Sequence, residues 1–141
     1  MHKLLLILHV AAFSTGLGMS FANLMNARLA AKYEGEAFKA LGRLRLLIAR
    51  IGDGVIAAIW VTGVALYVWR GGVPAADERI WFFAKIAAAV LLTACHFGAR
   101  RTAGALARSG DRSLLTQLAR FIAGVWLSAL AALALAVLAF A

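Results

Sequence analysis

The chain has 141 residues, of which 64% are hydrophobic and 15% are charged, and its mean hydropathy is +0.87. Such a composition excludes a water-soluble globular fold of this size and predicts a protein solvated by the lipid bilayer, without a separate soluble domain. The formal net charge of +9 would favour nucleic acid in a soluble protein. Here the cations lie mostly between apolar runs, where they set membrane orientation, so we expect no nucleic-acid partner.

Four apolar runs approach the length of about 20 residues that a helix needs to cross a bilayer. We place the helices at about residues 3–26, 46–69, 79–98 and 118–141, and the third could continue to residue 108. The connector between the first two carries the charged residues Lys32, Glu34, Glu36 and Lys39. The sequence therefore predicts one all-α domain, an integral membrane four-helix bundle.

The distribution of Lys and Arg predicts the orientation of this bundle. Most cations lie in or beside the first and third loops, namely Arg28, Lys32, Lys39, Arg43, Arg45, Arg50, Arg100, Arg101, Arg108, Arg112 and Arg120. Short loops rich in Lys and Arg stay in the cytoplasm. We therefore expect loops one and three in the cytoplasm and both termini on the outer, periplasmic side of a bacterial-type inner membrane.

The fourth helix carries small residues at every fourth position. Gly124, Ser128, Ala132 and Ala136 form this ridge, and small residues allow membrane helices to approach closely. We favour packing within the chain over a homo-oligomer contact, which the same pattern would also serve. Cys95, the only cysteine, is expected to be a small core residue.

Five polar residues fall inside the predicted hydrocarbon region, where a charge costs at least ~2.5 kcal/mol. They are His9, Asn23, Asp53, Lys85 and His96. At ~1.5 Å of rise per residue, His9 and Lys85 both lie about 9 Å inside the outer ends of their helices. His96 lies deeper, at the level of Asp53. The sequence thus predicts two polar layers inside the bundle.

The deeper layer is expected to include Asn23, at the end of the first helix, and Arg50, at the start of the second. A purely structural interpretation is open at both levels. Arg50 could pair with Asp53 at a spacing of three residues. A lysine near a helix end can extend to the interface, and a histidine can simply bond a neighbouring helix.

No zinc, phosphate-loop or serine-nucleophile pattern is present, which leaves haem or a proton pathway as the functional interpretations. Haem b in a membrane bundle needs an imidazole ligand and small residues, such as Gly16, that make room for the macrocycle. His9 and His96 are separated by about 15 Å of helix rise and should not share one iron. We expect His9 to ligate the iron, with the Lys85 ammonium near a propionate.

The third helix resembles a known family. Trp81-x-x-x-Lys85 followed by His96 is similar to the third-helix pattern of the HemJ-type protoporphyrinogen oxidases and the related CopD-like membrane proteins. His9 with Gly16 and Gly18 resembles the first helix of that family. The segment Thr62-Gly63 with Leu66 resembles the later half of its second helix.

The resemblance implies a four-helix haem b protein that depends on its first-helix histidine and third-helix lysine, here His9 and Lys85. It implies oxidation of protoporphyrinogen IX, with Lys85 as a catalytic residue and His96 near the cofactor. The tetrapyrrole could be a substrate or a fixed cofactor. Two other interpretations stay open: a cofactor-free accessory subunit of a larger membrane complex, and a CopD-like metal or proton transporter in which the polar layers form a relay.

Overall fold

The computed structural model describes residues 2–72 and 79–138. These residues form four α-helices, which are α1 (His2–Ala30), α2 (Gly35–Trp69), α3 (Arg79–Ser109) and α4 (Leu114–Leu138). All four are long and apolar enough to cross a membrane. The predicted all-α membrane bundle is therefore supported, although the last predicted residues, 139–141, lie outside the described part.

The helices extend beyond the apolar runs that predicted them. α2 begins at Gly35 instead of near residue 46, so most of the expected polar connector is helical. Its length of about 52 Å exceeds the ~30 Å hydrocarbon core. α3 continues to Ser109, close to the extension that we considered. The apolar run thus marks the part of a helix that lies in lipid, while charged residues that favour helix continue it into water.

Backbone hydrogen bonds and two glycines end α2 sharply. The N–H of Gly72 donates to the carbonyl of Tyr67 at 3.0 Å, and the N–H of Gly71 donates to the carbonyl of Val68 at 3.0 Å. Gly71 has a φ of 90°. This is the Schellman arrangement, in which glycine adopts the left-handed conformation after the last helical turn.

A short turn joins α3 to α4. The N–H of Ser113 donates to Asp111 Oδ1 at 2.9 Å, and the N–H of Asp111 donates to Ser109 Oγ at 3.1 Å. Hydrogen bonds from Ser113 favour the charged carboxylate and lower the pKa of Asp111 below its ordinary value. The turn therefore holds the α3–α4 hairpin closed through its own polar groups.

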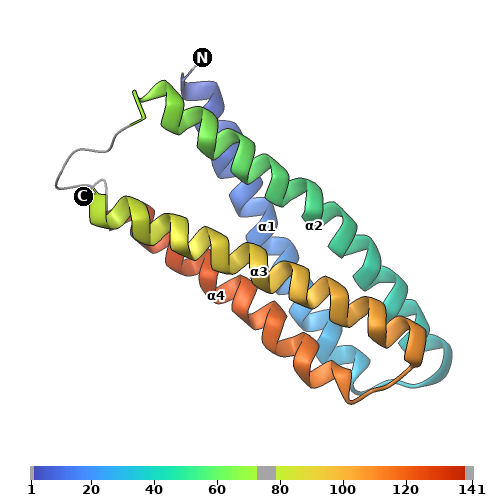
Figure 1. Ribbon diagram of the computed structural model, residues 1–141. Coiled ribbons are helices and arrows are strands. Elements are labelled where there is room, and N and C mark those ends of the chain that lie inside the picture. Colours follow the sequence, from blue (N-terminus) through green and yellow to red (C-terminus); the bar gives the residue numbers. More distant parts are fainter. Residues whose placement is uncertain (1, 73–78, 139–141) are drawn as a thin grey trace.

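The bundle consists of two hairpins, α1 with α2 and α3 with α4, which diverge from the end where their loops lie (Figure 1). We call this end the loop end and the opposite one the open end. On α1, the first buried residue among those described is Asn26. On α2 the last one is Ala49, and on α3 the first one is Leu92. The core thus occupies the half of the molecule nearer the loop end.

Small residues let α3 and α4 pack closely. A Cβ added to Gly98 would lie 2.6 Å from Phe121 Cε1, and one added to Gly124 would lie 2.8 Å from Cys95 Sγ. Ser128 and Ala132 on the same ridge of α4 are buried. The predicted packing of this ridge within the chain is confirmed for these residues, and Cys95 packs beside the core as expected.

Candidate functional site

Polar side chains meet at two levels along α2. The His9 layer comprises His9, Thr62 and Lys85, and the His96 layer comprises Asp53, His96 and Arg100. Their α2 members, Thr62 and Asp53, lie about 14 Å apart along the helix at ~1.5 Å per residue. The structure therefore places His9 and His96 at separate levels along α2, as the helix register indicated.

In the His9 layer, a hydrogen-bond chain links the imidazole to the α2 backbone. His9 Nδ1 lies 2.8 Å from Thr62 Oγ1, and Thr62 Oγ1 lies 2.6 Å from the carbonyl oxygen of Ala58. A hydroxyl has one proton, so when Thr62 donates to Ala58 it accepts from the Nδ1–H of His9. In that tautomer the neutral imidazole carries its lone pair on Nε2.

A glycine lets His9 approach α2. A Cβ added to Gly63 would lie 3.3 Å from His9 Cε1, which is closer than most real contacts. The ring thus lies against the α2 backbone and is half-buried. Thr62 and Gly63, which carried the second-helix resemblance, are the residues that contact it.

Lys85 lies within electrostatic range of His9, and no hydrogen bond joins the two described side chains. Its side chain is half-buried, and Nζ lies 5.9 Å from the ring centroid of Phe82. The ammonium also interacts with the charge of Arg70. Lys85 and His9 therefore interact electrostatically without forming a closed pair.

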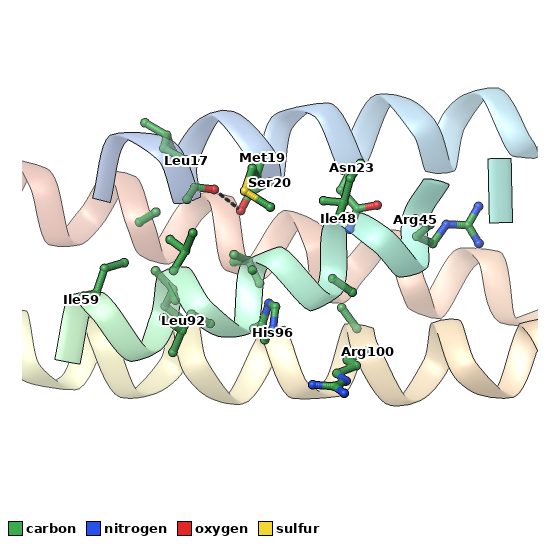
Figure 2. Close-up of a pocket in the computed structure, with 18 of the residues that line it drawn as sticks. Leu17, Met19, Ser20, Asn23, Arg45, Ile48, Ile59, Leu92, His96 and Arg100 are labelled. Atoms are coloured by element: carbon green, nitrogen blue, oxygen red, sulfur yellow. Dashed lines mark hydrogen bonds between the residues drawn. The ribbon is translucent and has the colours of Figure 1, made fainter. Parts of the chain in front are cut away.

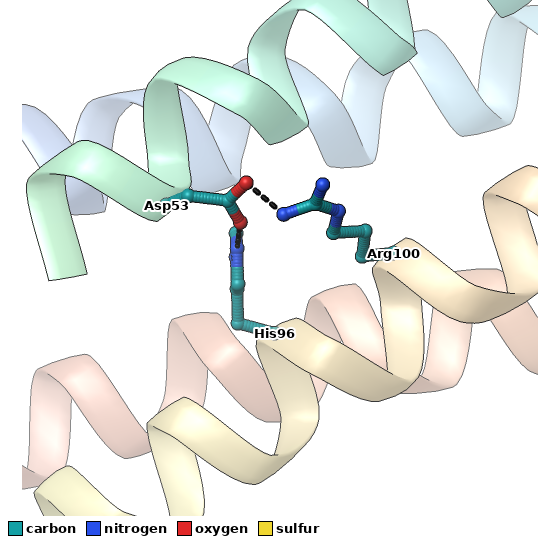
Figure 3. A network of polar contacts seen from close by, with 3 residues as sticks. All are labelled: Asp53, His96 and Arg100. Carbon is teal, nitrogen blue, oxygen red and sulfur yellow. Dashed lines mark hydrogen bonds and ion pairs between the residues drawn. The ribbon is translucent and has the colours of Figure 1, made fainter. Parts of the chain in front are cut away.

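The His96 layer is a closed ion-pair network across α2 and α3 (Figure 3). His96 Nε2 lies 2.9 Å from Asp53 Oδ1, and Arg100 Nη1 donates to Asp53 Oδ2. A Cβ on Gly52 would lie 2.8 Å from His96 Cε1, so this ring also lies directly on α2. The predicted meeting of His96 with Asp53 is present.

The alternative pairing of Asp53 with Arg50 is not present among the described residues. Arg50 is exposed, and Asp53 pairs instead with Arg100 of α3. Arg100 follows His96 by one helical turn and so faces α2 together with it. The network links two helices, whereas an Arg50 pair would have stayed within one.

A cavity of about 50 Å³ lies between the four helices beside the His96 layer (Figure 2). Its polar lining comes from Ser20, Asn23, Arg45, His96 and Arg100. Asn23 therefore belongs to this region, as predicted, whereas neither His9 nor Lys85 lines the cavity. Asn23 Oδ1 and Arg45 Nε are buried without a hydrogen-bond partner.

Gly16, expected to make room for a macrocycle, lies where α1 packs against α2. A Cβ at this position would lie 3.2 Å from Val55 Cγ1. The glycine therefore permits close packing of α1 on α2, and it also borders the cavity.

Sequence reasoning missed two polar contacts. Trp60 Nε1 donates to Thr93 Oγ1 at 3.0 Å between α2 and α3. Arg45 Nη2 donates to Asn26 Oδ1 at 3.4 Å between α1 and α2. Arg100 could have been found from its spacing after His96. Nothing distinguishes Arg45 from its neighbouring loop-side cations in the sequence.

The chain matches no protein-family model, no curated protein and no solved structure. The described residues contain no group of three or more His, Cys, Asp or Glu side chains that could hold a metal ion. Function must therefore be argued from the two polar layers and the cavity.

Proposed function

We propose that this membrane protein binds haem b through Nε2 of His9. The observation that carries the proposal is the hydrogen bond between His9 Nδ1 and Thr62 Oγ1 at 2.8 Å. Metal-ligating histidines usually donate their second ring N–H to a protein acceptor, which fixes the tautomer and the ring orientation. His9 meets this requirement, while His96 uses Nε2 to bond Asp53.

The surroundings of His9 fit a flat apolar group. The described part of the open end has no buried side chain on α1, α2 or α3 near this level, so a macrocycle there displaces no packed core. The Lys85 ammonium supplies a positive charge for a propionate. When bound, haem would supply redox chemistry at its iron, while the protein sets ligation and access.

The resemblance to the HemJ-type oxidases extends the proposal to an activity. We infer that a porphyrinogen ring is oxidised, as in the conversion of protoporphyrinogen IX to protoporphyrin IX, with six electrons and six protons passing to an electron acceptor outside this chain. Lys85 would bind a carboxylate of the tetrapyrrole. The contacts of His9 with Thr62 and Gly63 support this inference, because all three residues carry the resemblance.

The proposed orientation places loops one and three in the cytoplasm of a bacterial-type inner membrane. The cations at the loop end support it through the positive-inside rule. A reporter that is active only outside the cytoplasm, fused after residue 141, should be active. The same reporter inserted at Gly110 in the α3–α4 turn should be silent. The reverse pattern would invert the orientation.

The first experiment is a visible spectrum of the detergent-purified protein, oxidised and then reduced with dithionite, with haem quantified per chain. We expect a Soret band that shifts on reduction, at near one haem per chain. His9→Ala should lose it and recover part of it with added imidazole. His96→Ala should retain it. Loss of the band only in His96→Ala would contradict the assignment to His9.

A proton pathway is the second candidate, because the Asp53–His96 pair borders a cavity inside the bundle. Protons crossing the membrane would also have to reach the His9 layer, about 14 Å away along α2. Colourless protein from cells supplied with haem precursor would favour this candidate. Co-purification of such protein with a larger complex would favour an accessory subunit.

A further inference from the structure

The cavity beside the His96 layer contains a buried cation whose charge no neighbouring carboxylate balances. Arg45 is 2% exposed. The ion pairs of the described residues do not include it, and its one hydrogen bond is the 3.4 Å contact to Asn26. A guanidinium stays protonated in proteins, and burying such a charge without a counter-charge is strongly unfavourable.

Two polar atoms without hydrogen-bond partners belong to residues that line this cavity, and one needs an acceptor while the other needs a donor. Arg45 Nε is a buried donor without an acceptor, and Asn23 Oδ1 is a buried acceptor without a donor. Buried groups of this kind are nearly always satisfied by protein, water or a ligand. An occupant that satisfies both must accept one hydrogen bond and donate another.

The charges around the cavity favour an anion. Arg100 contributes a second guanidinium, and only its Nη1 is used by Asp53. Asp53 is the one carboxylate in contact with the polar lining, and His96 and Arg100 share it. Field lines from clustered cations concentrate in a cleft with apolar walls, which raises the local concentration of anions.

The cavity volume limits the size of the occupant. About 50 Å³ accommodates roughly three to five waters at 10–15 Å³ each. That space admits a small ion and excludes a porphyrin or a nucleotide.

We propose that this cavity binds a small monovalent oxyanion that carries a proton, of the bicarbonate or dihydrogen phosphate class. Its charged oxygens accept from Arg45 Nε, and its hydroxyl donates to Asn23 Oδ1. The site is separate from His9, so it stands or falls independently of haem binding. The anion neutralises Arg45 and joins α1 to α2 inside the bundle.

The test is thermal unfolding of the full chain in detergent at constant ionic strength near pH 7. Sodium gluconate, whose anion is too large for the cavity, is replaced stepwise by bicarbonate, dihydrogen phosphate or chloride. We expect the melting temperature to rise and saturate with either oxyanion, because a ligand that binds only the folded state stabilises it. Chloride, which has no donor for Asn23, should be weaker.

Matched variants assign the effect to the cavity. Arg45→Met should weaken the apparent affinity by at least about tenfold, whereas Arg43→Met removes an exposed charge from the same helix and should respond like the wild type. Asn23→Leu should abolish the preference for protonated oxyanions over chloride. Asn26→Asp places a carboxylate at the existing contact with Arg45, so this variant should no longer respond to added anion.

Three outcomes would overturn the proposal. Absence of a saturable shift in the wild type would mean that water alone fills the cavity. Equal responses of Arg45→Met and Arg43→Met would assign the shift to surface screening. If Arg45→Met fails to fold, the test rests on Asn26→Asp. A rise in its melting temperature with added anion equal to that of the wild type would refute the anion site.

Discussion

The loop end and the open end of the bundle are built differently. The loop end contains the buried residues of α1 and α2 and most of those of α3, and its two largest fully buried side chains, Leu118 and Ile122, come from α4. Large apolar side chains at the open end are exposed, including Leu4, Ile7, Val61, Val64, Val68 and Ile80. Packing among four helices fixes one half, while the other half presents apolar surface to lipid or to a ligand.

His9 and His96 make the same kind of contact with α2 but have different polar partners at the two ends of the bundle. Each ring lies on a glycine of α2, which is Gly63 for His9 and Gly52 for His96. At the loop end, His96 is tied to Asp53 and Arg100, so it links helices. Towards the open end, His9 contacts Thr62 through Nδ1, and in the tautomer that donates this proton Nε2 can accept from or bind another partner. The same helix contact thus supports a structural link at one level and a candidate ligand site at the other.

The comparison predicts the largest loss of stability for Asp53→Asn. The amide keeps the shape of the carboxylate but removes the charge shared by His96 and Arg100. Hydrogen bonds to charged groups contribute about 1.5–3 kcal/mol, and partial exposure of Arg100, 46%, reduces this value. We expect the free energy of unfolding, measured by titration with SDS, to fall by roughly 1–2 kcal/mol.

Glu36→Gln is the control for Asp53→Asn. It also removes a carboxylate, but one in an exposed pair with Lys39 on the same helix, and should change stability by less than about 0.5 kcal/mol. Equal losses in the two variants would show that the His96 layer does not link the hairpins more strongly than a surface pair does.

Gly52→Ala tests the close approach of His96 to α2. Alanine normally stabilises a helix by about 1 kcal/mol over glycine, but here its Cβ would lie 2.8 Å from His96 Cε1. Forced displacement of a packed ring costs about 1–3 kcal/mol, so we expect a net loss of about 1 kcal/mol in the same titration. Gly54→Ala, where nothing lies within 4 Å, should be neutral or stabilising. A stabilised Gly52→Ala protein would mean that the ring moves freely.

Helix register made the main features of the site predictable from the sequence. Apolar runs located four helices, and the rise per residue placed His9 and His96 at separate levels with Asp53 beside His96. These inferences depend only on spacing along single helices. Helix ends were harder to predict, because the charged residues from Gly35 onward continue the helix in water after the apolar run has ended.

Contacts between helices could not be predicted in the same way. Arg50 was the only arginine considered as a partner for Asp53, whereas the rotation of α3 against α2 brings Arg100 to it. Arg45 looked like one more cytoplasmic cation, yet it is buried in the bundle. Gly16 could have served a cofactor or helix packing, and its proximity to Val55 supports packing.

Thr62→Val tests the role of the His9 layer. Valine keeps the shape but removes the acceptor of His9 Nδ1–H, so stability should fall by about 0.5–1.5 kcal/mol. If His9 ligates haem, loss of the group that orients it should weaken haem binding by about 10–100-fold. Thr93→Val removes the acceptor of Trp60 in a similar contact and should cost comparable stability without changing the haem spectrum. Equal haem affinity in both variants would show that Thr62 does not orient His9 for haem binding.

The smallest effect is expected from Arg112→Ala at the surface of the loop end. Arg112 Nη1 donates to Glu34 Oε1 at 2.9 Å, and Nη2 donates to the carbonyl of Ala31 at 2.9 Å, so one side chain ties the two loops together. Glu34 is 86% exposed, and exposed pairs contribute about 0–1 kcal/mol. We therefore expect a loss below about 1 kcal/mol that shrinks as salt rises. A loss as large as that of Asp53→Asn, unchanged by salt, would mean that the loops and not the buried residues between them hold the hairpins together.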